Sequence, residues 1–88
     1  MVTPYDEHTE DGMTVRHFNM TADEWDLVWH RDERDRRISV VDGHGWKFQF
    51  DNCMPFELHK GDEFFVEAMT YHRVIKGFTP LTIQIKEF

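Results

Sequence analysis

The sequence has little cysteine, few basic residues and no long apolar run. Cys53 is the single cysteine among 88 residues, so the chain cannot form an internal disulfide. This excludes a disulfide-stapled secreted miniprotein and fits a reducing compartment. No apolar run approaches the roughly 18 residues of a membrane-spanning helix, and residues 1–7 lack the basic and apolar regions of a signal peptide. We therefore expect a soluble cytoplasmic protein.

The charge balance excludes two classes of partner. Lys and Arg number 10 against 17 Asp and Glu, which gives a formal net charge of −7. The sequence has no basic stripe that could follow a phosphate backbone, so we do not expect a nucleic-acid partner. The same negative charge disfavours binding to an anionic membrane surface.

What the chain does have is aromatic residues and period-2 alternation. Eight Phe, three Trp and two Tyr can build a compact core, which a chain of this length needs because it buries only about 60–65% of its unfolded surface. Apolar and polar residues alternate over 46–51 and over 81–86, the pattern of half-buried strands. By the same reading we expect strands over 13–18, 37–41, 46–51, 63–67, 71–76 and 81–86, with a short edge segment over 54–58 because it contains Pro55.

Turn residues separate these segments, at 42–45, 51–52, 60–62 and 76–77. Seven or eight short strands at this spacing predict an all-β fold, a small antiparallel β-barrel or jelly-roll-like sandwich. Residues 13–88 are expected to form this single domain. The polar, acidic residues 1–12 are expected to be a flexible N-terminal arm.

The segment 24–30 is ambiguous. Thr21 and Glu24 have the spacing of a capping box, which would begin a helix. Trp25, Leu27 and Trp29 instead occupy every second position, as in a strand, and the residues on either side of them are Glu24, Asp26, Val28 and His30. We favour a strand because the neighbouring segments are strands.

Gly61 and His72 bound the most informative stretch of the chain. A turn glycine is followed by a strand rich in Phe and Val, a second turn, and a histidine that enters the next strand. A histidine in that place is carried on a rigid sheet and can point inward. It could also be a hydrogen-bonded core histidine with no further role.

This stretch resembles the second sequence motif of the cupin superfamily of small β-barrels. The spacing of that motif is kept, and Gly61 and His72 keep its residue types, whereas Glu67, Met69 and Lys76 depart from them. The first cupin motif falls on four positions further upstream: His30, Asp32, Arg36 and Gly43. Only His30 and Gly43 match that motif in kind.

The resemblance implies a cupin-like barrel and a site for one divalent metal ion. Cupins usually hold the ion through two histidines and a glutamate of the first motif and the histidine of the second. The corresponding positions here are His30, Asp32, Arg36 and His72. Two imidazoles and one carboxylate form the ligand set of non-heme Fe(II) sites and also suit zinc with a bound water. Fe, Mn, Ni and Zn are therefore all open.

Arg36 is the residue that fits a metal site least. It has the same parity as Ile38, so it should face the cavity, where its permanent charge disfavours a nearby metal ion unless an anion lies between them. Either Asp35 replaces it as the carboxylate ligand, or Arg36 binds the carboxylate or phosphate of a substrate. Asp32 could instead pair with neighbouring arginines in surface ion pairs, which stabilise little.

Three functions remain open. The chain could be a metal-dependent cupin that binds or acts on a small anionic molecule, by oxidation, isomerisation or lyase chemistry if it is an enzyme. It could be a metal-free binding module whose polar pocket holds an anionic ligand, or an interaction module with a degenerate metal site. We expect a homodimer in each case.

Overall fold

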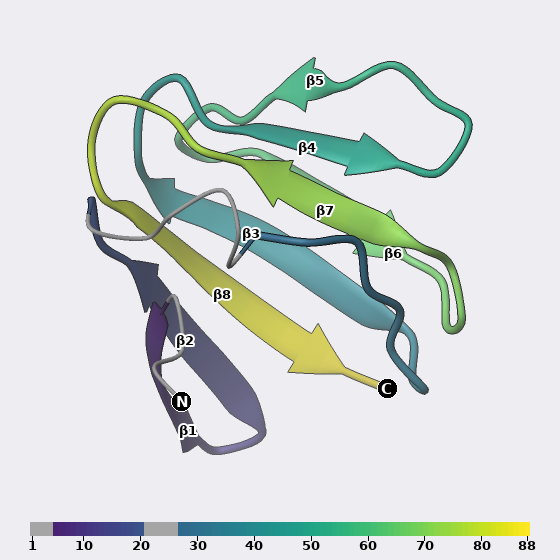
Figure 1. Cartoon of the computed structure of the whole chain (residues 1–88). Coiled ribbons are helices and arrows are strands. Elements are labelled where there is room, and N and C mark those ends of the chain that lie inside the picture. The colour runs from purple at the N-terminus through teal and green to yellow at the C-terminus, as the bar shows by residue number, and fades with distance from the viewer. Residues whose placement is uncertain (1–4, 21–26) are drawn as a thin grey trace.

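The computed structural model describes residues 5–20 and 27–88 and is built of β-strands. The strands are β1 (Tyr5–Glu10), β2 (Met13–Phe18), β3 (Arg36–Asp42), β4 (Lys47–Phe50), β5 (Phe56–Glu57), β6 (Glu63–Val66), β7 (His72–Ile75) and β8 (Leu81–Glu87). They pair in two antiparallel sheets, one with the order β1-β2-β8-β3-β6 and one with the order β5-β4-β7. The second sheet lies as a layer over β3 and β8 (Figure 1). The all-β antiparallel fold is confirmed.

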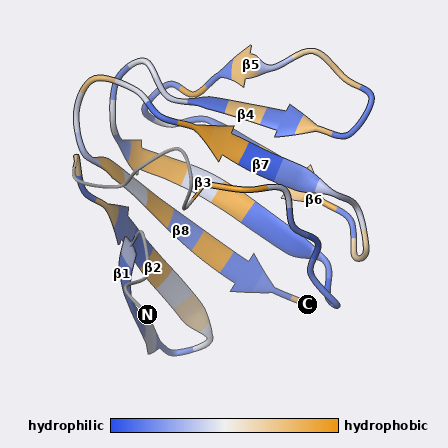
Figure 2. Ribbon diagram, in the orientation of Figure 1, coloured by the Kyte–Doolittle hydropathy of each residue, from blue (hydrophilic) through white to orange (hydrophobic). Residues whose placement is uncertain are grey.

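The core fills the space between the two sheets. On β8, Leu81, Ile83 and Ile85 are buried and alternate with partly exposed polar residues. Figure 2 shows the resulting apolar and polar bands along this strand. From the other sheet, Phe48 in β4 and Trp46 just before this strand supply the aromatic part of the core. Because each such side chain contributes roughly 1.5–3 kcal/mol when fully buried, the alternation that was visible in the sequence also holds the two sheets together.

The short edge segment is also confirmed. Within the predicted range 54–58, Phe56–Glu57 form β5, which lies at the edge of the three-stranded sheet. Strand β2 covers the predicted range 13–18 without a shift. The turn glycine that was expected at Gly61 has a φ of +92°, a backbone conformation that glycine adopts without strain.

The N-terminal residues differ from the flexible arm that their composition predicts. Residues 5–10 form β1, and six residue pairs join this strand to β2. Asp11 and Gly12 connect the two strands with φ values of 52° and 77°, as a two-residue hairpin turn requires. The charged residues fit because β1 is an edge strand, and a charged edge strand resists pairing with other chains.

The ambiguous segment 24–30 is only partly described, since residues 21–26 lie outside the described ranges. Residues 27–29 form neither a strand nor a helix, so the strand prediction is wrong for them. Leu27 is buried in the core, and His30 makes an isolated β-bridge to His72. Residues 27–29 are thus an irregular segment that leads to a single β-bridge at His30, where a regular strand was expected.

Candidate metal centre

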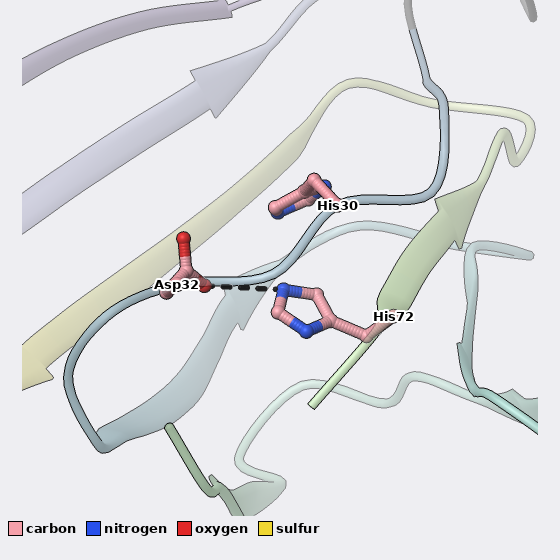
Figure 3. A group of neighbouring side chains, drawn as sticks. All are labelled: His30, Asp32 and His72. Carbon is pink, nitrogen blue, oxygen red and sulfur yellow. Dashed lines mark ion pairs between the residues drawn. The ribbon is translucent and has the colours of Figure 1, made fainter. Parts of the chain in front are cut away.

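The structure brings His30 and His72 together although they are 42 positions apart in the sequence. The backbone N–H of His30 donates to the carbonyl of His72 at 3.0 Å, and the N–H of His72 donates back to His30 at 2.9 Å. This bridge sets the two side chains side by side, with ring centroids 4.3 Å apart and nearly perpendicular ring planes. His72 is buried at the start of β7, whereas His30 is exposed to solvent. Figure 3 shows both rings facing the same space.

Asp32 completes the group from the same segment as His30. Its Oδ2 atom lies 3.3 Å from Nε2 of His72 (Figure 3). The backbone carbonyl of Asp32 accepts the N–H of Met69 at 2.7 Å, which fixes this turn against the loop before β7. Oδ2 is buried, and it has no hydrogen-bond partner among the described residues. A buried carboxylate oxygen without a donor is costly, so it needs a specific explanation.

Backbone carbonyls select the same tautomer in both imidazoles. Nδ1 of His72 lies 2.8 Å from the carbonyl oxygen of Thr70, and Nδ1 of His30 lies 3.2 Å from that of Val28. Because a carbonyl oxygen only accepts hydrogen bonds, these partners place the proton on Nδ1 and leave a lone pair on Nε2. This is the arrangement by which a second hydrogen bond orients a histidine for metal binding.

Burial keeps His72 neutral. Desolvation is the largest influence and lowers the pKa of His72 below its ordinary 6.5. The hydrogen bond to Thr70 and the charge of Asp32 raise this pKa, whereas electrostatic interactions with His30 and Arg36 lower it. The ring of Phe48 stacks against that of His72 with centroids 5.3 Å apart. At neutral pH, Nε2 of His72 and Oδ2 of Asp32 are therefore two acceptors that face each other across 3.3 Å. A cation between them would relieve this contact.

The donor set fits such a cation. Donor atoms of His30, Asp32 and His72 all lie within 4.8 Å of one another. Ligand atoms at about 2.0–2.2 Å around a tetrahedral ion are about 3.4 Å apart, so the donor atoms that are farthest apart would have to approach by about 1.4 Å. Two imidazole nitrogens and one carboxylate oxygen are ligands that Fe(II) and Zn(II) accept in proteins.

Arg36 faces the cavity but is held there by two carboxylates. Its Nη1 lies 3.3 Å from Oδ1 of Asp32, and its Nε and Nη2 donate to Oε2 of Glu87 at 3.0 and 2.7 Å. Glu87 stands directly opposite Arg36 in the pairing of β3 with β8. The positive charge of Arg36, which disfavours a nearby metal ion, is therefore balanced by the carboxylates of Asp32 and Glu87. Asp35, the alternative ligand, accepts the N–H of Ala68 at 2.7 Å and does not belong to the three-residue group.

A pocket of about 240 Å³ opens beside this group. Its lining is mainly apolar and comes from both sheets, with polar atoms from His30, Asp32, His72 and two arginines, Arg16 and Arg36. Arg16 was not among the site residues that the sequence predicts. Arg16 and Phe18 are two positions apart on β2, so they lie on the same face of the strand. Nothing in the sequence showed, however, which face of β2 turns inward.

No family model and no curated protein matches the chain, but solved structures do. Over 83% of this chain, a crystal structure of DMSP lyases (RdDddP and RnDddQII) superposes with a TM-score of 0.71 at 23% identity. A structure of Fe(II)-HppE with an alternative substrate matches over 96% of this chain, with a TM-score of 0.70 at 16% identity. The chain has the cupin fold. The fold that the two sequence motifs implied is thus confirmed.

This chain and its structural neighbours differ in length. It spans 35% of the DMSP lyase chain and 48% of the HppE chain. A protein from Neisseria meningitidis is closer in size, since this chain covers 81% of it, with a TM-score of 0.64 at 15% identity. The described residues also contain no helix with the length and hydropathy to cross a membrane.

Proposed function

We propose that this chain is a metal-dependent cupin that binds a small anionic molecule beside the ion, with His30, Asp32 and His72 as the protein ligands. The observation that carries the proposal is the buried, unpartnered Oδ2 of Asp32 at 3.3 Å from Nε2 of His72. Both imidazoles present the nitrogen that would bind a metal, because Val28 and Thr70 hold the other one. A bound divalent ion would act as a Lewis acid on a substrate oxygen.

The pocket supports a small ligand. Its 240 Å³ lies below the 300–1,000 Å³ range of drug-sized ligands. Two arginines among its lining residues favour a negatively charged group on that ligand. The role that the sequence suggests for Arg36, direct contact with the substrate, stays a prediction. Its three nitrogens are already paired with Asp32 and Glu87.

The reaction class is taken from the neighbours only as a proposal. HppE binds Fe(II) or Co(II) together with its substrate, and two further neighbours are DMSP lyases. Iron, manganese, nickel and zinc all remain candidate ions for this chain, and oxidation, isomerisation and elimination remain candidate reactions. The ligand set alone does not choose among them, since one fold hosts many chemistries.

Zinc titration tests the metal site without redox chemistry. After removal of metal with EDTA and dialysis, isothermal titration should show one Zn(II) per chain. We expect His72→Gln to weaken the zinc affinity at least about a hundredfold, because it removes a buried imidazole that would bind the metal directly. His59→Gln is the matched control, since His59 is an exposed histidine that contacts Glu57 at 2.8 Å. No zinc binding by the native chain, or equal affinity in His72→Gln, would favour the metal-free binding module.

A homodimer also remains a prediction. Phe65 on β6 and Phe88 after β8 are about half exposed, and their ring centroids lie 6.1 Å apart. Strand β6 is the edge of the five-stranded sheet, so a second copy could cover this apolar surface. Sedimentation equilibrium should show a dimer that Phe65→Lys dissociates; a native monomer at high concentration would contradict it.

A further inference from the structure

Arg16 enters the pocket from β2, a strand that carries none of the proposed metal ligands. It stands directly opposite Ile83 of β8, and directly opposed residues of an antiparallel pair share one face of the sheet. Ile83 is buried and lines the pocket, so Arg16 lies on the inner face as well. Only 13% of its side chain is exposed. A permanently charged group is thus held largely out of water.

Two contacts fix the plane of this guanidinium. Nε of Arg16 donates to Oε2 of Glu7 at 2.8 Å, and the guanidinium carbon lies 4.0 Å from the centroid of the Tyr5 ring. Both partners come from β1. Such a salt bridge and ring contact leave the side chain little rotational freedom, so its remaining N–H groups are oriented before any ligand arrives.

The remaining donors of Arg16 are Nη1 and Nη2, and no described residue accepts a hydrogen bond from them. Arg36 differs in this respect, since its Nε, Nη1 and Nη2 all contact Asp32 or Glu87. The two arginines of the pocket therefore have different roles. Arg36 holds Asp32 in position, whereas Arg16 offers a free pair of N–H groups to the cavity.

We propose that Arg16 determines specificity by binding the anionic group of a short amphipathic substrate. Two parallel N–H groups of one guanidinium match the two oxygens of a carboxylate or phosphate. Phe18, Ile38 and Phe48 line the same pocket, and they would contact the apolar middle of that molecule. Its other end would face His30, Asp32 and His72, which is the part of this inference that rests on the proposed function.

Butanoate and butanamide are suitable probes, because they have the same length and differ in the charge of one end group. Each is titrated into zinc-saturated protein, and binding is followed by the chemical shifts of the Arg16 side-chain N–H groups and by calorimetry. We expect butanoate to bind at least about tenfold more tightly than butanamide. Arg16→Gln should abolish this preference and leave zinc affinity within about twofold. Arg16→Lys, which keeps the charge and loses the paired donors, should restore only part of it.

Arg36→Gln is the matched variant within the same pocket. It should weaken zinc binding through Asp32 and retain the preference for butanoate. A preference that survives Arg16→Gln would overturn the assignment, whatever Arg36→Gln does, and so would a native chain that binds zinc but not butanoate. Failure of the proposed metal site is seen separately, in the zinc isotherm that precedes the titration.

Discussion

Replacing Asp32 with asparagine should stabilise the metal-free protein while it weakens metal binding. In the native chain Oδ2 of Asp32 faces Nε2 of His72 at 3.3 Å without a hydrogen-bond donor on either side. An amide at this position can direct its NH₂ group at Nε2 and keep its oxygen for Nη1 of Arg36, which now lies 3.3 Å from Oδ1. The substitution therefore turns a contact between two acceptors into a hydrogen bond.

The magnitude follows from three contributions. A new hydrogen bond stabilises by about 0.5–1.5 kcal/mol, and removal of an unsatisfied buried acceptor adds about 1 kcal/mol or more. Against these, the ion pair of Asp32 with Arg36 becomes a neutral hydrogen bond, which costs about 1 kcal/mol for a pair with 15% and 18% side-chain exposure. The net expectation is a gain of about 1 kcal/mol, equivalent to about 4–8 °C in Tm for a domain of this size.

Urea unfolding at pH 7.5 in EDTA measures this change, with the fluorescence of the fully buried Trp46 as one signal. Zinc affinity of Asp32→Asn should fall at least about tenfold, because a neutral amide is a weaker ligand than a carboxylate. Asp35→Asn is the control from the same segment. Its carboxylate accepts the N–H of Ala68 at 2.7 Å, so that variant should lose about 0.5–1 kcal/mol. If Asp32→Asn instead loses 1 kcal/mol or more, Asp32 is a structural ion-pair partner and its Oδ2 atom is not destabilising.

Two further predictions concern pH and the turns. Metal-free protein should lose stability as pH falls below 6.5. His72 in the unfolded chain has its ordinary pKa of 6.5, whereas burial lowers its pKa in the folded chain, so the unfolded chain takes up the proton first. Urea unfolding between pH 5 and 7.5 should show a weaker dependence of the unfolding free energy on pH in His72→Gln than in the native chain, and an equal dependence would contradict this. Gly77→Ala should cost more than about 2 kcal/mol, because a Cβ would collide with backbone atoms of His44 and Trp46. Gly61→Ala, with open space and a φ of +92°, should cost about 1 kcal/mol, and similar unfolding midpoints for the two would count against the packing described.

Much of the fold could be predicted because burial on one face leaves a period-2 pattern. Strand β8 reads directly from Leu81, Ile83 and Ile85, all of which are buried. Strand β1 could not be read in this way. Its outward positions are polar, and on the inner face only Tyr5 packs against the core, since Glu7 pairs with Arg16. An inward glutamate that is paired with an arginine of the neighbouring strand interrupts the apolar pattern of β1, although β2 remains recognisable from its own sequence.

The members of the candidate site were predictable from the sequence, but their contacts were not. Motif spacing identified His30, Asp32 and His72, and the structure brings these three together. The engagement of Arg36 by Glu87 depends on the register between β3 and β8, which residue spacing along one chain segment does not determine. The tautomers of the two histidines likewise depend on loop carbonyls whose positions only the folded chain defines.

An anomalous difference map from crystals grown with Zn(II) would show directly whether His30, Asp32 and His72 bind a metal ion. One peak is expected, within about 2.0–2.2 Å of a ring nitrogen of His30, a ring nitrogen of His72 and a carboxylate oxygen of Asp32. A peak only at surface groups such as His59 with Glu57, or a water hydrogen-bonded between Asp32 and His72 in fully zinc-soaked crystals, would contradict this expectation.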